Sequence, residues 1–268
     1  MVLIDLPKIG LGTAQMDRKT TEFAVGKALE LGYRLIDTAQ LYGNEQAVGA
    51  AIKTSGVQRD EIILATKLGT FATSATSVPK ATAVSLKKLQ TDYVDLLYVH
   101  WPLMTYKPAK TLPAMSKLVE EEKVRYVCAS NFPVKYLEVA IAVCPKAIAA
   151  NQVEHHPLLP QLTLREYMPA HDITLVAYSP LGRGNLNAVP ELTQIAKKHE
   201  VSVGQVTLAW EISHGAVPIP KASSESHLKD NLAAVDLTLD AEDISQIDAI
   251  KTRKRFINFP IFHPKWDP

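Results

Sequence analysis

Four side chains that can move or stabilise a proton follow short apolar segments of the chain. Asp37, Lys67 and His100 each come at the end of a predicted strand, and Tyr42 follows Asp37 by five residues. Because neighbouring strands lie about 4.8 Å apart, the ends of three consecutive strands would meet at one edge of a sheet. We expect Tyr42 to fold back over that edge from its loop.

Each of these residues also has a simpler interpretation. An aspartate at a strand end often caps a loop, a lysine usually reaches solvent, and a lone histidine is often only hydrogen-bonded. Four such residues at one edge, with the apolar Trp101 next to His100, favour a catalytic site.

The chemistry that suits this set is proton donation. A free tyrosine has a pKa of about 10 and is a poor acid at neutral pH, but a neighbouring ammonium stabilises the phenolate. We therefore expect Asp37 to orient Lys67 and Lys67 to lower the pKa of Tyr42. His100 would hydrogen-bond the oxygen that receives the proton. A general acid beside a carbonyl group is half of a reduction, and the other half needs a hydride.

Alternating strands and helices would have to position these residues. Most of the apolar runs are too continuously apolar for a half-exposed strand, which indicates strands covered on both faces. The predicted strands are residues 9–13, 34–37, 62–66, 94–99, 124–128, 147–153, 173–178 and 216–219.

Amphipathic segments separate these runs. Asn44 is placed to cap the second helix, and Gly56 is placed to end it. Pro79 lies where the third helix would begin. The predicted helical segments cover residues 24–29, 48–52, a stretch that starts near 79, 112–122, 134–143, 191–199, 203–213, 224–233 and, outside the repeating pattern, 240–250.

Eight strand–helix alternations predict an α/β fold, a TIM (β/α)8 barrel that forms a single domain over residues 1–268. The extra helices and a short C-terminal tail across the rim would be additions to it. An open doubly wound sheet is the alternative, because alternation alone does not show closure. In a barrel, catalytic residues lie at the carboxyl ends of the strands.

The composition narrows the classes of partner. With 29 basic and 28 acidic side chains, the chain lacks the charge of a nucleic-acid-binding protein. It has no apolar run long enough for a membrane span and no signal-peptide pattern, so we expect a cytoplasmic protein, and a monomer. Two cysteines, Cys128 and Cys144, predict reduced core residues rather than a disulfide framework.

Other motifs are weaker. Gly10-Leu11-Gly12 has Gln15 where a dinucleotide-binding loop needs its third glycine, so we interpret it as a tight turn. The glycines around Arg183 follow the seventh predicted strand, where barrels often bind phosphate. His155-His156 lacks the further ligands of a metal site, and no Gly-x-Ser-x-Gly motif indicates a hydrolase.

The chain resembles the aldo-keto reductases, most closely short prokaryotic and yeast-like members such as the diketogluconate reductases. The resemblance runs from Lys8 to Trp266. It implies a TIM barrel that reduces carbonyl compounds with a nicotinamide cofactor, usually NADPH, bound in extended form. Its motifs are Gly10-Leu11-Gly12-Thr13, Asp37-Thr38-Ala39, Tyr42-Gly43-Asn44-Glu45, Thr66-Lys67, Val99-His100-Trp101-Pro102, Ser130-Asn131-Phe132, Asn151-Gln152-Val153-Glu154, Tyr178-Ser179-Pro180-Leu181-Gly182 and Ile219-Pro220-Lys221.

The resemblance also implies a set of cofactor-binding residues. The carboxamide of the nicotinamide would be held by three polar side chains, the ring would stack on a tyrosine, and two later loops would hold the phosphates and the adenosine. These residues are Ser130, Asn131 and Gln152 for the carboxamide, Tyr178 for the ring, Ser179, Leu181 and Gly182 for the pyrophosphate, Lys221, Ala222, Ser223, His227 and Asn231 for the adenosine end, and Gly12, Thr13 and Asp37 as further cofactor-binding residues.

The adenosine end departs from the family pattern. Ala222 replaces a common serine, and His227 replaces an arginine that would clamp the 2′-phosphate. Neutral histidine offers neither a permanent charge nor a fork for phosphate. We therefore predict that the protein binds NADPH, with a weaker preference over NADH than typical relatives.

The substrate would be a small carbonyl compound. By the resemblance, Leu41 and Trp101 form apolar walls next to Tyr42 and His100. The tail from Arg255 through Phe259, Pro260 and Phe262 to Trp266 is either a partial lid or an anchor for the terminus.

Two other functions remain as alternatives. One is a non-catalytic subunit of the same fold that binds nicotinamide nucleotides for regulation or as a structural protein. The other is a barrel isomerase or aldolase that uses Lys67 as a Schiff base, which would need a depressed lysine pKa. Asp37 would act in the opposite direction, so this alternative is the least favoured.

Overall fold

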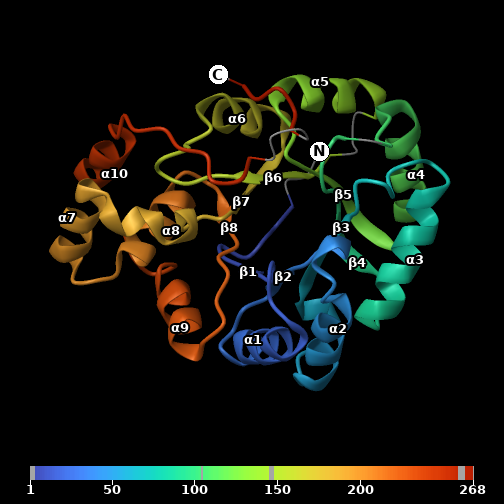
Figure 1. Ribbon diagram of the computed structural model, residues 1–268, viewed down its shortest axis with the longest axis horizontal. Coiled ribbons are helices and arrows are strands. Elements are labelled where there is room, and N and C mark those ends of the chain that lie inside the picture. Colours follow the sequence, from blue (N-terminus) through green and yellow to red (C-terminus); the bar gives the residue numbers. More distant parts are fainter. Residues whose placement is uncertain (1–3, 104, 145–147, 259–262, 268) are drawn as a thin grey trace.

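The computed structural model describes residues 4–103, 105–144, 148–258 and 263–267. Within these ranges, eight parallel strands form one sheet whose order follows the sequence. Figure 1 shows the strands at the centre with helices around them. The strands are β1 (Leu11–Gly12), β2 (Leu35–Asp37), β3 (Ile63–Leu68), β4 (Val94–Val99), β5 (Val124–Ser130), β6 (Ala150–Glu154), β7 (Thr174–Tyr178) and β8 (Val217–Pro218).

Hydrogen bonds between the first and last strands close this sheet. The backbone N–H of Gly10 donates to the carbonyl of Pro218 (2.9 Å), and that of Gly12 donates to the carbonyl of Pro220 (3.2 Å). The approach is so close that a Cβ on Gly12 would lie 2.7 Å from the carbonyl oxygen of Ile219. The predicted barrel is therefore confirmed, and the open doubly wound sheet is wrong. The two glycines serve barrel closure.

The helices surround the barrel in the predicted order. Those over Val134–Val143 and Val203–Ser213 have the predicted bounds. The helices are α1 (Arg18–Glu30), α2 (Glu45–Thr54), α3 (Ser77–Leu89), α4 (Pro108–Glu120), α5 (Val134–Val143), α6 (Leu162–Tyr167), α7 (Pro190–His199), α8 (Val203–Ser213), α9 (Glu225–Ala233) and α10 (Ala241–Asp248).

Two local expectations differ from the structure, and a third falls on a residue that the structure does not describe. Helix α4 begins at Pro108, a turn earlier than predicted, and carries Pro113 inside it. Helix α6 was not predicted, because six residues are too few to show a helical period. Ala147, at the start of the sixth predicted strand, lies outside the described residues.

The expected cap at Asn44 is also corrected. Asn44 immediately precedes α2, but its side chain makes no capping hydrogen bond. Its amide instead donates to the carbonyl of Thr13 (2.8 Å) and accepts from the hydroxyl of Thr38 (2.8 Å). The buried side chain thus joins the loop after β1 to the loop after β2.

Two apolar layers hold the barrel. A cluster that includes Leu35, Ala65, Tyr98 and Cys128 draws its buried members mainly from the strands, so it fills the barrel interior. A larger cluster packs the outer strand faces against the helices. Because side chains alternate along a strand, Lys67 points inward like Ala65. No helix in the described ranges is long and apolar enough to cross a membrane.

Candidate active site

The structure brings together the four predicted catalytic residues. Asp37 ends β2, and Lys67 lies near the end of the adjacent β3. The Lys67 ammonium is completely buried, forms an ion pair with the Asp37 carboxylate and donates to the carbonyl of Thr38 (2.9 Å). Lys67 Nζ lies 5.0 Å from the centre of the Tyr42 ring. The rings of Tyr42 and His100 meet edge to face, with centroids 5.7 Å apart.

The surroundings set the charge of two of these groups. Burial opposes the charge of Lys67, but Asp37 and Tyr42 outweigh it and raise the pKa of the amine. The amine therefore stays an ammonium at neutral pH, which disfavours the Schiff-base alternative. Burial, and then the charge of Lys67, hold the pKa of His100 well below its usual value. His100 is therefore a neutral hydrogen-bonding group at neutral pH.

The pKa of Tyr42 corrects the expectation from sequence. Burial raises the pKa of the phenol above 10.0, and this effect exceeds the lowering caused by the charge of Lys67. Lys67 acts in the predicted direction, but it does not make Tyr42 more acidic than a free tyrosine. Burial in the cavity wall, which follows from the packing of the whole barrel, decides the sign.

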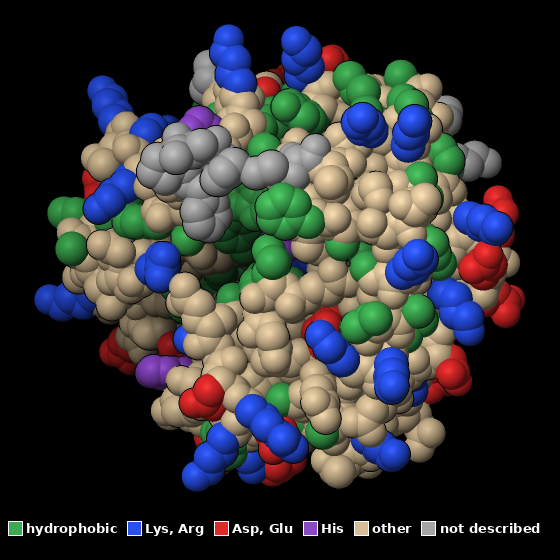
Figure 2. Space-filling view, turned by 45° about the vertical axis from the view of Figure 1, so that its right-hand side comes forward, with side chains coloured by type: hydrophobic (Ala, Val, Ile, Leu, Met, Phe, Trp, Pro, Cys, Tyr) green, Lys and Arg blue, Asp and Glu red, His purple; other side chains and the backbone are tan. Residues whose placement is uncertain are grey.

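A cavity of about 590 Å³ opens beside these residues. Figure 2 shows a hollow with hydrophobic side chains at its margin on one face of the molecule. At one end the cavity wall contains all four predicted substrate residues, Leu41, Tyr42, His100 and Trp101. The predicted cofactor residues that line the cavity are Gly12, Asp37, Asn131, Gln152, Tyr178, Ser179, Leu181 and Lys221.

Seven predicted cofactor residues do not line this cavity. Thr13 and Ser130 are buried beneath it, with their hydroxyls bonded to the carbonyls of Asp37 and Gln152. Their cofactor role stays a prediction. The others are Gly182, Ala222 and Asn231, which are buried, and Ser223 and His227, which are exposed.

The polar side chains at the centre of the cavity hold one another in place. Gln152 donates to the second carboxylate oxygen of Asp37 (2.8 Å). The hydroxyl of Tyr178 donates to the side-chain oxygen of Asn131 (2.8 Å), whose amide donates to the carbonyl of His100 (3.0 Å). Asn131 adopts a left-handed backbone with φ of 63°. Through these hydrogen bonds, the predicted cofactor residues Gln152 and Asn131 are connected to Asp37 and His100, which restricts their side-chain orientations.

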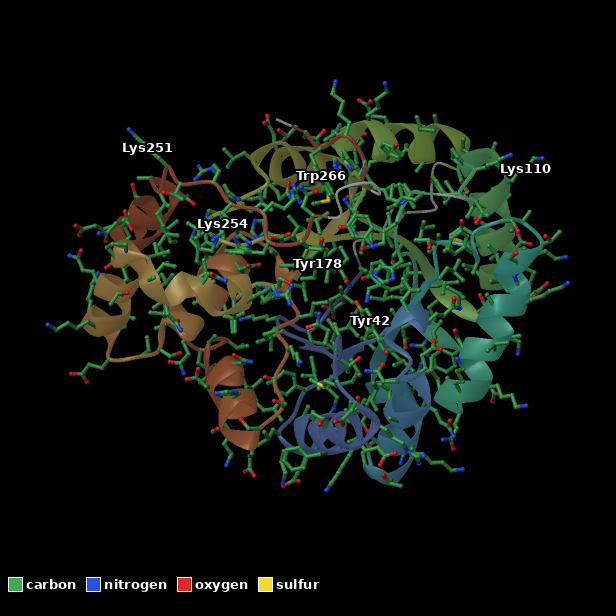
Figure 3. All side chains as sticks on the ribbon, viewed as in Figure 1. Tyr42, Lys110, Tyr178, Lys251, Lys254 and Trp266 are labelled. Carbon is green, nitrogen blue, oxygen red and sulfur yellow. The ribbon has the colours of Figure 1, made fainter. Side chains whose placement is uncertain are left out.

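These residues fit a nicotinamide dinucleotide. Figure 3 places Tyr42 and Tyr178 near the centre of the barrel, and both rings line the same cavity. Tyr178 offers a flat apolar face on which a ring can stack. Arg183 and Lys221 line the cavity as well and supply cations for phosphate groups.

Several residues that line the cavity were not predicted as site residues, among them Gln15 and Ile219. Gln15 lies in the loop after β1 and has a φ of 59°, and Ile219 directly follows β8. Only closure of the barrel places these two loops side by side. Both would have been found if every residue directly after β1 and β8, and in the loops that follow, had been considered as a site residue.

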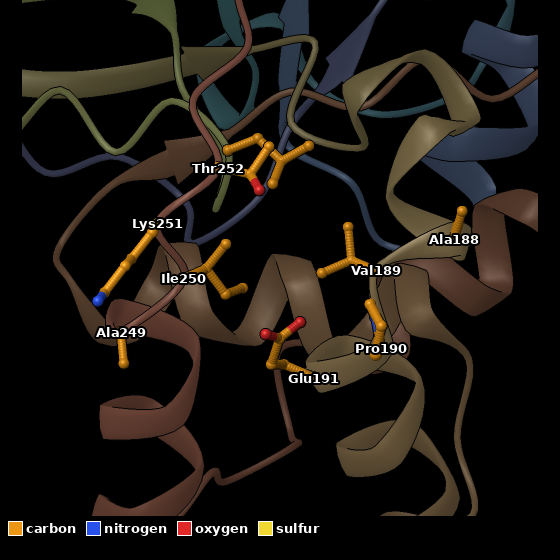
Figure 4. Close-up of a pocket in the computed structure, with 9 residues that line it drawn as sticks. Ala188, Val189, Pro190, Glu191, Ala249, Ile250, Lys251 and Thr252 are labelled. Atoms are coloured by element: carbon orange, nitrogen blue, oxygen red, sulfur yellow. The ribbon is translucent and has the colours of Figure 1, made fainter.

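Two other features lie apart from this site. His155 contacts Glu211 (3.0 Å) and His156 contacts Glu154 (3.1 Å), so the adjacent histidines turn to different carboxylates. A second cavity, of about 510 Å³, lies between the start of α7 and the segment after α10. Figure 4 shows its lining, which includes none of the predicted catalytic or cofactor residues.

Comparisons with known proteins agree with this geometry. The model of the Aldo/keto reductase family matches residues 8–252. The glyoxal reductase of Bacillus subtilis (strain 168) is 40% identical over 254 residues, 94% of this chain and 91% of that protein. An aldo/keto reductase from Brucella melitensis superposes with a TM-score of 0.87 at 41% identity, over 91% of this chain and 93% of that one. A putative 2,5-diketo-D-gluconic acid reductase B has a TM-score of 0.94 at 33% identity, over 98% and 94% of the two chains.

Proposed function

Because this chain belongs to the aldo/keto reductase family and is an oxidoreductase, we propose that it reduces small aldehydes and ketones with NADPH and that Tyr42 supplies the proton. The observation that carries the proposal is the buried Lys67 ammonium, held by Asp37 and placed beside the Tyr42 ring at the cavity wall. A buried charge of this kind needs a paired carboxylate and serves the neighbouring phenol.

The residues divide the work of proton transfer. A bound nicotinamide supplies a hydride to the carbonyl carbon. Tyr42 donates its proton to the carbonyl oxygen, and the ammonium of Lys67 stabilises the phenolate that is left. Asp37 keeps Lys67 charged and oriented. His100, neutral in its buried setting, hydrogen-bonds the same oxygen and fixes where the carbonyl group lies.

The cofactor would be held along the length of the cavity. Tyr178 would stack on the nicotinamide ring, and Asn131 and Gln152, with Ser130 behind them, would hold its carboxamide. Arg183 and Lys221 would neutralise the phosphates, since both cations line the cavity wall.

The substrate end suits a compact carbonyl compound. Its wall is formed by Leu41 and Trp101 together with Tyr42 and His100. The glyoxal reductase of Bacillus subtilis covers nearly the whole chain at 40% identity. We therefore propose 2-oxoaldehydes and other small aldehydes as substrates. Two free cysteines, Cys128 and Cys144, suit a protein of the reducing cytoplasm, and we propose that it acts there as a monomer.

The test is direct. Purified protein is mixed with NADPH and a panel of aldehydes that includes glyoxal and methylglyoxal, and cofactor oxidation is followed by absorbance. We expect turnover with several members of the panel. Tight binding of NADPH without turnover of any aldehyde would instead support the non-catalytic nucleotide-binding alternative.

The cofactor preference gives a separate prediction. Lys221 is the cation near the adenosine end that lines the cavity, whereas His227 is exposed and lacks the fork of an arginine. Competitive titration should show a preference for NADPH over NADH below about a thousandfold, or about 4 kcal/mol. His227→Arg should increase that preference and leave the affinity for NADH unchanged. A preference in the wild type above this limit would contradict the prediction.

A further inference from the structure

A buried carboxylate outside the catalytic set holds the C-terminal segment of the chain. Glu154 ends β6 and is completely buried. One of its oxygens accepts the backbone N–H of Phe256 (2.6 Å), and the other accepts that of Ile257 (2.8 Å). His156 also lies 3.1 Å from the first oxygen. Both oxygens of Glu154 are thus used on a segment about a hundred residues later in the chain.

The carboxylate is charged at neutral pH. Burial favours the neutral form, but the hydrogen bonds from His156, Phe256 and Ile257 outweigh it and lower the pKa of Glu154 below 4.5. A charged acceptor makes the stronger hydrogen bonds. A buried charge with three donors around it is built to hold those donors in one position.

The held segment, residues 254–257, is here called the strap. Figure 1 shows the chain after α10 running along the β6 and β7 side of the barrel toward α5. Lys254 N donates to the carbonyl of Leu158 (2.8 Å) at the start of the strap. The ring of Phe256 packs on His156, with centroids 5.2 Å apart. Ile257, at the end of the strap, lines the proposed active-site cavity.

The strap is also linked by ring contacts to Trp101, one of the predicted substrate residues. The Arg255 guanidinium lies 3.8 Å from the centre of the Trp266 ring. Trp266 in turn meets Trp101 edge to face, with centroids 6.2 Å apart. Figure 3 labels Trp266 on the C-terminal segment, above Tyr178 in the view. One carboxylate therefore positions Ile257 directly, and it steadies Trp101 through Arg255 and Trp266.

We propose that Glu154 is a positioning residue that holds the strap as an apolar wall, and that this wall selects carbonyl substrates whose side chains reach Ile257 and Trp101. The proposal rests on the proposed function of the cavity. We expect a substrate whose only side chain is a methyl group, such as methylglyoxal, to contact only the residues around Tyr42. A substrate with an aromatic ring needs the wall.

The first test separates the two kinds of substrate. In Glu154→Gln, the amide oxygen can accept one N–H, while the amide nitrogen faces the other donor, so the strap is released on one side. We expect kcat/KM for phenylglyoxal to fall about tenfold relative to methylglyoxal, through KM, since one or two apolar contacts carry discrimination of that size. If kcat/KM for phenylglyoxal divided by kcat/KM for methylglyoxal is unchanged or increased in the variant, the proposal is overturned.

Glu211→Gln is the matched control. Glu211 is equally buried and also contacts a histidine, His155, but it does not bind the strap. An equal fall in the substrate ratio in both variants would show general loosening of the fold and overturn the role of Glu154.

The second test does not depend on turnover. Brief trypsin digestion followed by mass spectrometry measures cleavage after Arg255, next to the N–H that Glu154 binds, and after the exposed Lys251, outside the strap. We expect Glu154→Gln to accelerate cleavage after Arg255 at least several-fold, with no change after Lys251. Equal cleavage rates after Arg255 in wild type and variant would refute the proposal that Glu154 holds the strap, even if the enzyme proves active. Absence of turnover in the wild type would refute only the proposed function.

A backbone variant covers the case in which Glu154→Gln does not fold. Ile257→Pro removes the N–H that binds the second carboxylate oxygen and leaves Glu154 intact, while Ile257→Val keeps that N–H. Because both variants change a side chain that lines the cavity, trypsin cleavage is the readout here: we expect the proline variant, and not the valine variant, to accelerate cleavage after Arg255. The same behaviour in the two variants would overturn the proposal.

Discussion

At the scale of single residues, the site depends on charge states that burial creates. Lys67 remains an ammonium because Asp37 lies against it, and His100 remains neutral because it is buried near that ammonium. Tyr42 keeps its proton at neutral pH because burial raises its pKa. Each group is therefore in the form that a carbonyl reduction requires at the start of the reaction.

Removing the phenol hydroxyl tests Tyr42 directly. Tyr42→Phe should lower kcat by at least a hundredfold, because general acid catalysis contributes about 10² to 10⁴. Its affinity for NADPH, measured by quenching of protein fluorescence, should be nearly unchanged since the ring remains. Tyr126→Phe, at an exposed position on β5, is the control and should leave both values unaltered. Activity of Tyr42→Phe within about tenfold of the wild type would rule out Tyr42 as the acid.

The pKa directions predict how the two reaction directions depend on pH. Reduction needs the protonated phenol, so its kcat/KM should be flat from about pH 6 to 9, below the raised pKa of Tyr42. Alcohol oxidation needs the phenolate, so its rate should rise with pH across that range. The measurement is a pair of pH–rate profiles. A step in the reduction profile near pH 6.5, the usual pKa of histidine, would show that His100 titrates and contradict its assignment as neutral.

At the scale of elements, close approaches between neighbours set the positions of the strand ends. The seam between β1 and β8 closes through glycine backbone, and α2 lies against the end of α3 at Gly49. A Cβ there would come within 2.4 Å of the carbonyl oxygen of Leu89. Helix α2 follows the turn that carries Tyr42, so this contact also helps to place the proposed acid.

Two helical glycines offer a matched pair of variants. Gly49→Ala should destabilise the protein by about 1–3 kcal/mol, because backbone must move to admit the methyl group. Gly26→Ala in α1 has nothing within 4 Å of the new Cβ and should stabilise it by about 0.5–1 kcal/mol through helix propensity. Urea denaturation of both variants measures the difference. Effects of the same sign would contradict the packing described here.

At the scale of the whole molecule, the proposed catalytic residues and a buried carboxylate with ion pairs lie at opposite ends of the barrel. The proposed catalytic residues lie at or just after the carboxyl ends of the strands. Asp95 lies at the amino end of β4 and is completely buried. Its carboxylate accepts from Arg59 (2.9 Å), Arg125 (2.8 Å) and the backbone N–H of Leu64 (2.9 Å). Asp95 thus joins β3, β4 and β5 at the end of the barrel away from the proposed catalytic residues, where we expect it to serve folding rather than turnover.

Asp95→Asn should therefore separate the two properties. Losing the charge weakens the ion pairs with two arginines that solvent partly reaches, so we expect a cost of about 1–3 kcal/mol. We expect a lower midpoint in urea and an unchanged kcat at 25 °C, where the variant is still folded. A loss of kcat in the folded variant would show that the two ends are coupled.

How much could be predicted from the sequence also differs between these scales. The apolar runs and the residues that begin or end them predict the order of strands and helices, because both patterns are local in the sequence. The shared direction of strand ends then places Asp37, Lys67 and His100 together. Helix α6 escaped prediction because it is short, and the partners of Asn44 escaped because they come from other loops.

By itself, the amino-acid sequence determined the order of strands and helices, the family and the set of residues at the carboxyl ends of the strands, since periodicity and motif spacing are read without coordinates. Only the tertiary structure decided the direction of the Tyr42 pKa, the closure at Gly12 and the pairing of Glu154 with Phe256 and Ile257. The reason is physical. Desolvation and hydrogen bonds between segments that lie 102 residues apart depend on how the whole chain packs.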